Sequence, residues 1–168
     1  KIKNIVLKVP TWVREMYVGQ KFKIREIPQV DAIFNIRFCT AVALLKKRLS
    51  LQHFEENSIK DPEITKIINK ITVEEFEIPQ KNKFRTSLII EMKDGKELFT
   101  EINFPKGEPV NNPLSMEEIR EKFLRNISFS QVVSDKNAEK ILYLIENLEG
   151  VSKINELTKL LTPQKVLC

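Results

Sequence analysis

The segment VDAIFNIRFCTAVALL is almost wholly apolar, but it contains three polar residues that could bind a ligand: Asn35, Arg37 and Thr40. We expect this segment, Val30–Leu45, to form a helix. On a helix, Arg37 and Thr40 share one side while Asn35 points elsewhere, so the three side chains cannot all contact one ligand. The pattern therefore raises the question of what an arginine does in such an apolar setting.

Two interpretations of Arg37 remain open. In the first, its guanidinium faces a cavity and binds an anion, because arginine forms bidentate bonds with carboxylates that are strongest where water is excluded. In the second, Arg37 pairs with a carboxylate of its own domain, such as Glu26 or Asp31, since a charge in an apolar helix needs a partner. Arg14 and Tyr17, which precede the helix, are further candidates for the same cleft.

Residues suited to other kinds of chemistry are scarce. His53 is the only histidine, and without further metal ligands nearby it is expected to be a partly exposed structural residue rather than a zinc ligand. Cys39 is expected to pack as a small hydrophobic residue, and the terminal Cys168 to be frayed and reducible. Two such cysteines do not make a disulfide scaffold, which favours a cytoplasmic protein. The four glycines stand alone, so no glycine-rich phosphate loop is expected.

The composition is that of a folded, soluble domain. The 168 residues suffice for one domain, or one domain with a small appendage, and 42% of them are apolar and 30% charged. The net charge of +5 is mild, and Lys and Glu are interleaved rather than gathered into a basic stripe, so no nucleic-acid partner is expected. The apolar run Val30–Leu45 is shorter than the roughly 20 residues of a membrane span, and Arg37 interrupts it.

Periodicity and local signals predict an α+β fold, with an antiparallel or mixed sheet of about four strands, helices packed on one face, and C-terminal helices. The signals include a Pro after the Asp61 N-cap, a hairpin at Asp94 and Gly95, and a capping box from Ser115 to Glu118. The first half is expected to contain a strand at 5–9, a loop at 11–29 with a short extended stretch at 22–24, a helix at 30–45 and a helix from 62. Strands at 71–77, 86–93 and 97–104 should follow, and then helices from 116, 135 and 154. In the helix from 135, residues 141, 142, 145 and 148 are expected to face inward, and Gly150 is expected to be the C′ residue.

Long stretches of the chain resemble the C-terminal half of the MmgE/PrpD family, which includes 2-methylcitrate dehydratases, cis-aconitate decarboxylases and iminodisuccinate epimerases. The similarity runs through PQVDAIFNIRFCTAVALL, the Asp61–Pro62 helix start, MKDGKELF and PKGEPVNNPLSMEEIREKF. The resemblance implies a two-domain enzyme with a large helical domain, a smaller α+β lid, and the active site between them. It implies proton abstraction beside a carboxylate of a small di- or tricarboxylate, without a metal or organic cofactor.

The matched motif is an Ala-x-Phe-Ser-x-x-Tyr-like segment, and this chain departs from it at two places. Asn35 stands where the family has serine, and Phe38 stands where it has tyrosine, so two hydroxyls are missing. The resemblance places the family's catalytic groups in the helical domain, so no residue here inherits a catalytic role. The substrate-binding candidates are Arg37, Asn35, Phe38, Thr40, Arg14 and Tyr17.

The resemblance also predicts how the chain is organised. We expect an α+β lid-like domain over residues 1–112, and a helical segment over 113–168 that packs on it or on a missing helical domain. The chain is expected to be a piece of a longer protein, with the helical domain of the same or another chain as its partner and a homodimer as a possible assembly. An exposed apolar face should then mark the docking surface. The alternative is a non-catalytic binding or self-association module that reuses the lid fold.

Overall fold

The computed structural model describes residues 1–76 and 83–162. The chain divides into two compact units, Lys1–Asn112 and Pro113–Cys168, and each is described here by itself. Two expectations lie outside the described residues: the state of Cys168, and the end of the strand expected at 71–77.

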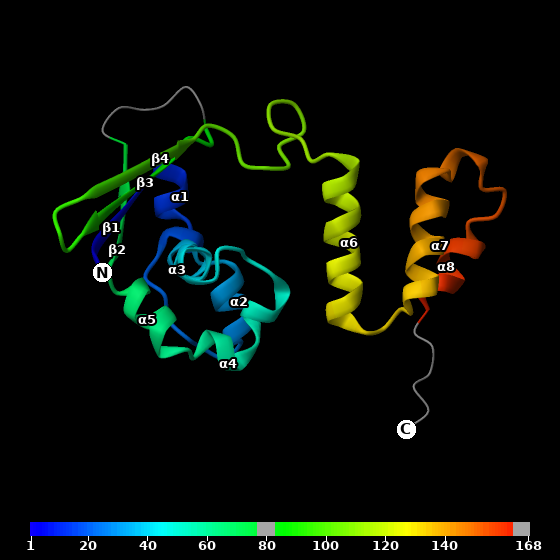
Figure 1. Ribbon diagram of the computed structural model, residues 1–168, viewed down its shortest axis with the longest axis horizontal. Coiled ribbons are helices and arrows are strands. Elements are labelled where there is room, and N and C mark those ends of the chain that lie inside the picture. Colours follow the sequence, from blue (N-terminus) through cyan, green and yellow to red (C-terminus); the bar gives the residue numbers. More distant parts are fainter. Residues whose placement is uncertain (77–82, 163–168) are drawn as a thin grey trace. The chain divides into compact units, whose positions relative to one another are not determined.

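A four-stranded mixed sheet forms one layer of the first unit (Figure 1). Its order is β2-β1-β3-β4, with β1 parallel to β2 and the other pairs antiparallel. The strands are β1 Ile2–Val9, β2 Ile71–Glu75, β3 Thr86–Met92 and β4 Glu97–Ile102. The predicted hairpin between β3 and β4 is confirmed, and Gly95 takes the left-handed φ of +85° that its turn requires. The predicted α+β class is confirmed as well.

The helices of the first unit are short. They are α1 Thr11–Glu15, α2 Pro28–Ile33, α3 Ile36–Lys46, α4 Glu56–Ile59 and α5 Pro62–Ile68, with 3-10 turns η1 Tyr17–Gly19 and η2 Leu51–Phe54. As predicted, α5 begins after Asp61, whose side chain accepts a hydrogen bond from the Glu63 N–H at 2.8 Å. Of all helices in the described part of the chain, none has the length and apolar character needed to cross a membrane.

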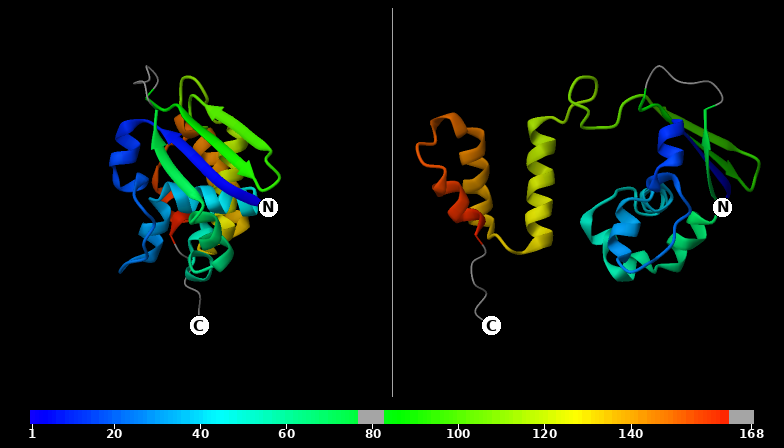
Figure 2. Two further views of the ribbon diagram at one scale, coloured as in Figure 1. Left: turned by 90° about the vertical axis from the view of Figure 1, so that its left-hand side faces the viewer. Right: turned by 180° about the vertical axis from the view of Figure 1, so that it is seen from behind.

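The core of this unit lies between the sheet and the helices α2 to α5. In the left-hand view of Figure 2 the strands face the viewer, and these helices lie behind and below them. Alternate strand residues face the core, as expected for a sheet with one buried face. The buried strand residues are Ile5, Leu7, Val9, Ile71, Val73 and Ile90, and they pack against Ala32, Phe38, Ala41, Val42, Ile59, Ile64 and Ile68.

The apolar segment at 30–45 is two helices rather than the one expected. α2 ends at Ile33, Phe34 follows, and Asn35 caps a new helix, α3, by accepting hydrogen bonds from the N–H groups of Arg37 and Phe38. The asparagine side chain competes for helix N–H groups and so restarts the helix, although the hydrophobicity does not change. The expected loop at 11–29 is also partly wrong, because it contains α1 and η1.

The second unit consists of helices. They are α6 Met116–Ser130, α7 Asp135–Glu146, the 3-10 turn η3 Leu148–Gly150 and α8 Asn155–Leu161. The predicted capping box is confirmed at the start of α6, where Ser115 and Glu118 exchange hydrogen bonds. An ion pair between Arg120 and Glu146 joins α6 to α7.

Two details expected of the second unit are wrong. Ile141 and Leu142 are buried, but Ile145 and Leu148 are about half exposed, because α7 meets its neighbours along a narrower stripe than its apolar residues span. Gly150 is not the C′ residue of α7, which ends at Glu146 with Asn147 as its C-cap, and it belongs to η3 instead.

Candidate functional site

Three of the six predicted site residues, Arg37, Asn35 and Arg14, meet around Gly19 and Gln20, at the end of η1. The Nη1 atom of Arg37 donates to the carbonyl oxygens of Gly19, at 2.5 Å, and Gln20, at 2.7 Å. Asn35 Nδ2 donates to the same Gln20 oxygen at 3.0 Å, and Gln20 Nε2 donates to the carbonyl of Arg14 at 3.0 Å. Gln20 thus connects α1 to the start of α3, through its side-chain amide on one side and its backbone carbonyl on the other.

The expectation that Asn35 points away from Arg37 is wrong. Because Asn35 is the N-cap of α3 and not a residue of a continuous helix, its amide reaches the same carbonyl as the guanidinium. The suggested pairing of Arg37 with Glu26 or Asp31 is not found either. Backbone carbonyls hold Arg37, and Asp31 pairs with Arg25.

Arg37 is a half-buried cation whose hydrogen-bonding capacity is only partly used. Burial lowers the pKa of its guanidinium from the ordinary value, but the group stays protonated at neutral pH. Within residues 1–76 and 83–162, its Nε and Nη2 atoms donate to no protein group, and neither is among the buried atoms that lack a partner. This edge of the guanidinium therefore reaches solvent.

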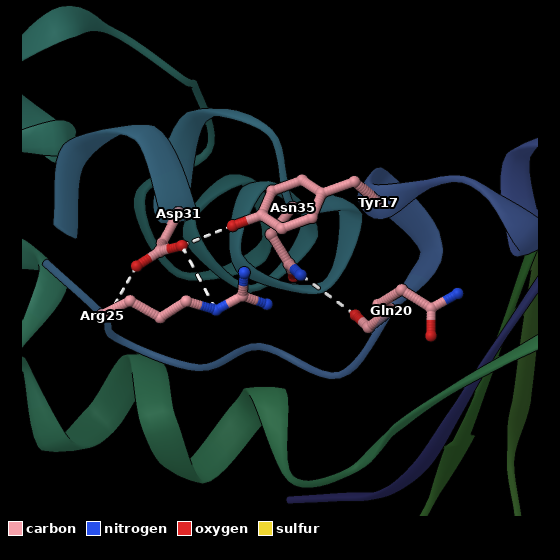
Figure 3. A network of polar contacts seen from close by, with 5 residues as sticks. All are labelled: Tyr17, Gln20, Arg25, Asp31 and Asn35. Atoms are coloured by element: carbon pink, nitrogen blue, oxygen red, sulfur yellow. Dashed lines mark hydrogen bonds and ion pairs between the residues drawn. The ribbon is translucent and has the colours of Figure 1, made fainter. Parts of the chain in front are cut away.

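Tyr17, a fourth predicted site residue, belongs to a second polar cluster, centred on the buried Asp31 (Figure 3). The Asp31 carboxylate accepts hydrogen bonds from the Tyr17 hydroxyl and from the Arg25 N–H, the latter at 2.6 Å. The Arg25 guanidinium lies 3.9 Å from the carboxylate and 5.1 Å from the centre of the Tyr17 ring. The hydrogen bond from Tyr17, aided by Arg25, holds the pKa of Asp31 below its usual range, and the same bond raises the pKa of Tyr17.

These two clusters fix one continuous segment, residues 17–25, which we call the strap. Asp31 holds both of its ends, at Tyr17 and Arg25, and α3 holds its middle at Gly19 and Gln20. The strap is thereby ordered although most of it has no regular secondary structure.

The other predicted site residues have different surroundings. Phe38 is fully buried, with its ring centre 5.2 Å from that of Phe22 and 5.9 Å from that of Phe54. Thr40 is half-buried on α3, one turn beyond Arg37. The Arg14 guanidinium pairs with Glu75 at 2.8 Å. Phe38 therefore contributes to the core and offers no surface to a ligand in this conformation.

The single histidine is buried and not partly exposed as expected. His53 Nδ1 accepts a hydrogen bond from the Ser50 N–H at 3.1 Å and lies 3.1 Å from the Ser50 hydroxyl. Burial of the Cys39 thiol raises its pKa to about 11, so it is not a reactive thiolate. Among the described residues there is no group of histidine, cysteine and acidic side chains that could hold a metal ion.

His53 should make the stability of the first unit pH-dependent in mildly acidic solution. Burial, reinforced by Arg48 and Lys46, lowers the pKa of His53, so the unfolded chain binds the proton more readily. Stability is then full above the unfolded pKa of about 6.5 and falls as the pH drops below it, with at most about a tenfold change in the unfolding constant per pH unit. Urea titrations of wild type and His53→Asn between pH 7.5 and 5 test this, because asparagine can accept the Ser50 N–H but cannot be protonated. An equal slope in both proteins would contradict it.

Asn35 should be replaceable by serine but not by alanine. Asn35→Ala removes both capping bonds of α3 and the bond to Gln20, and N-cap losses typically cost about 1 kcal/mol. Asn35→Ser, which restores the residue of the family pattern, keeps a capping oxygen and should retain most of the stability. Urea unfolding followed by the fluorescence of Trp12, the only tryptophan, measures both variants. Equal losses would show that capping is not what Asn35 contributes.

An exposed apolar surface adjoins the strap. Val30 and Ile33 of α2 recur at helical spacing with its two capping residues, Ile27 and Phe34, and each of the four is between 43% and 60% exposed. We call this surface the α2 face. Soluble monomers rarely expose contiguous apolar patches of this kind, which usually mark interaction surfaces.

Gln20 and Asp31 hold the site together, but the sequence contained no indication of Gln20 and suggested Asp31 only as a partner of Arg37, not of Tyr17 and Arg25. Gln20 bonds to Asn35, 15 residues away, and Asp31 bonds to Tyr17, 14 residues away. Contacts at such sequence separations are not visible in a short sequence motif. Residues 1–50 contain eleven Lys and Arg residues but only three acidic ones, so the charges are less evenly interleaved along the chain than expected. The positive charge is concentrated in the part of the chain that contains the strap.

The sheet order and the helices on its one face define the first unit as an α+β domain, which is followed in the chain by a helical unit. A model of the MmgE/PrpD C-terminal domain matches residues 1–150. The chain therefore belongs to the MmgE/PrpD family and represents its C-terminal domain, as the motifs indicated. A comparison with curated proteins finds no match.

Proposed function

We propose that this chain is the lid portion of an MmgE/PrpD-type lyase or isomerase, and that it works only together with a helical domain of the same or another chain. The family match supports the assignment, and the α2 face is the observation that carries the need for a partner. Four half-exposed apolar side chains on one short helix and its capping residues would be costly to leave in water.

In this proposal the substrate is a small di- or tricarboxylate. The helical domain supplies the groups that remove or deliver a proton beside a carboxylate, and the lid supplies positive charge and closes over the substrate. Closure excludes water, which strengthens the electrostatic interactions with the substrate and protects a carbanion-like intermediate. The concentration of positive charge in residues 1–50 is consistent with a polyanionic substrate.

Binding measurements with the helical domain test the proposal. The chain should form a one-to-one complex with an MmgE/PrpD helical domain from the same source, seen by light scattering and calorimetry. Val30→Glu with Phe34→Glu should weaken that complex by about tenfold or more, since two charges would be buried in an apolar contact. The matched control is Phe99→Glu, because Phe99 is 63% exposed but lies on the sheet face turned away from the core.

Activity assays complete the test. Turnover of methylcitrate, citrate or cis-aconitate should require both parts, and the chain alone should be inactive. Enzymatic turnover by the 168 residues alone would overturn the proposal, as would a complex that the α2 face variant leaves intact. Self-association of the chain through the α2 face, without affinity for the helical domain, would favour the binding-module alternative.

A further inference from the structure

The guanidinium of Arg37 is held in place by hydrogen bonds from Nη1, while its Nε–Nη2 edge bonds to no protein group among the described residues. Both bonds of Nη1 go to carbonyl oxygens of consecutive residues, Gly19 and Gln20, which fix the plane of the guanidinium. Asn35 restrains the same Gln20 carbonyl, and Gln20 is tied to Arg14, so the acceptors themselves are held. An arginine prepared in this way loses little side-chain entropy when it binds a further group.

The vacant side has the geometry that a carboxylate requires. The Nε and Nη2 hydrogens of a guanidinium are parallel and match the two oxygens of one carboxylate. No carboxylate of the described residues occupies this edge: Asp31 pairs with Arg25, and Glu75 pairs with Arg14. The desolvation that lowers the pKa of Arg37 also means that an anion would meet it in a partly water-excluded setting.

Thr40 provides a second polar group on the same side of α3. Residues three apart on a helix are neighbours, with about 5–6 Å between their Cβ atoms. In the part of the chain that the structure describes, the Thr40 hydroxyl makes no hydrogen bond, and it is not among the buried atoms that lack a partner. It is therefore available to donate to a ligand on this side of α3.

We infer that the Nε–Nη2 edge of Arg37 and the Thr40 hydroxyl together form a carboxylate-binding subsite. The identity of the physiological ligand, a small polycarboxylate, rests on the proposed function, whereas the subsite itself rests on the geometry of the strap and α3. Lys21 and Lys23, both exposed on the strap, add a positive potential that attracts such ligands without holding them.

A titration of the 168-residue chain with tricarballylate tests the subsite, followed by the NMR signals of the arginine Nε–Hε groups. The Arg37 signal should shift saturably with tricarballylate and not with its uncharged triamide. Arg37→Lys should weaken binding by about tenfold, because it keeps the charge but loses the parallel pair of donors. Thr40→Val, which leaves the strap untouched, should weaken it about threefold to tenfold, as expected for one hydrogen bond.

Lys23→Met is the matched control, since it removes one positive charge from the strap without touching the guanidinium. It should change the affinity by less than about threefold, an effect that added salt abolishes. The inference is overturned if the Arg37 signal does not respond at tens of millimolar tricarballylate, if Thr40→Val binds as well as wild type, or if Lys23→Met weakens binding as much as Arg37→Lys. The proposed function would fail differently, in the docking experiment with the helical domain.

Discussion

Replacing Phe38 with alanine is expected to lower the free energy of unfolding of the first unit by about 4 kcal/mol. The ring is fully buried and lies between Phe22 and Phe54, so its removal leaves a cavity as well as losing the transfer free energy of the side chain. The backbone of α3 limits collapse into that space, because its first turn is fixed by the Asn35 cap. An effect of this size is a large fraction of the stability of an ordinary domain.

Urea denaturation of the whole chain, followed by Trp12 fluorescence, measures this effect in the unit that contains Phe38. Trp12 is suited to the purpose because its indole N–H donates to the carbonyl of Lys83 at 3.0 Å, a contact that unfolding of this unit must break. Phe99→Ala is the control, since an exposed phenylalanine should change stability by only about 0.5 kcal/mol. Similar losses in the two variants would mean that Phe38 is not a core residue.

The position of Phe38 also bears on how this chain differs from its family. Phe38, which stands at the tyrosine position of the motif that this segment resembles, has no exposed surface. A hydroxyl on this ring would need a buried hydrogen-bond partner, and an unsatisfied one costs about 1–3 kcal/mol. A phenylalanine avoids this cost, so the aromatic ring without a hydroxyl suits a fully buried position.

Local signals predicted those parts of the fold that local interactions determine. Asp94 and Gly95 define a hairpin because the turn requires a left-handed residue, and Ser115 with Glu118 defines a helix start because the two groups satisfy each other. The alternation of apolar Ile5, Leu7 and Val9 with their neighbours predicted the strand that the structure shows as β1. In each case the deciding atoms are within four residues of one another.

The parts of the fold that the sequence did not predict depend on contacts between residues distant in sequence, or on a polar side chain that interrupts a helix within an apolar segment. Asn35 is a good N-cap residue, but the segments on either side of it are equally hydrophobic. Periodicity alone therefore predicted one helix where the structure has two, α2 and α3. The strap has no period at all, and Asp31 orders it through partners at Tyr17 and Arg25 that only the folded chain brings together. His53 looked polar and exposed in sequence, yet Ser50 satisfies it locally and allows its burial.

Replacing Gly19 with alanine should be the most damaging small change in the strap. A Cβ at this position would lie 2.7 Å from the Cα and from the carbonyl oxygen of Arg14, and it would also overlap the carbonyl of Val13. All three atoms are backbone, so no side chain can rotate away, and η1 must separate from α1. We expect a loss of about 3 kcal/mol, at the upper end of the usual range for overpacking.

The same displacement should disturb Arg37, because the carbonyl oxygen of Gly19 is one of its two acceptors. Gly19→Ala is therefore expected to lower the urea midpoint seen by Trp12 and also to shift the Arg37 Nε–Hε signal in the absence of any ligand. Gly150→Ala, where a Cβ meets nothing within 4 Å, controls for the glycine-to-alanine change itself. Gln20→Ala removes the side-chain bond to Arg14 but keeps the backbone carbonyl that accepts from Arg37. Comparing it with Gly19→Ala therefore separates the loss of a side-chain hydrogen bond from displacement of the backbone. A Gly19→Ala protein with wild-type stability and an unmoved Arg37 signal would show that the close approach of η1 to α1 does not position the guanidinium.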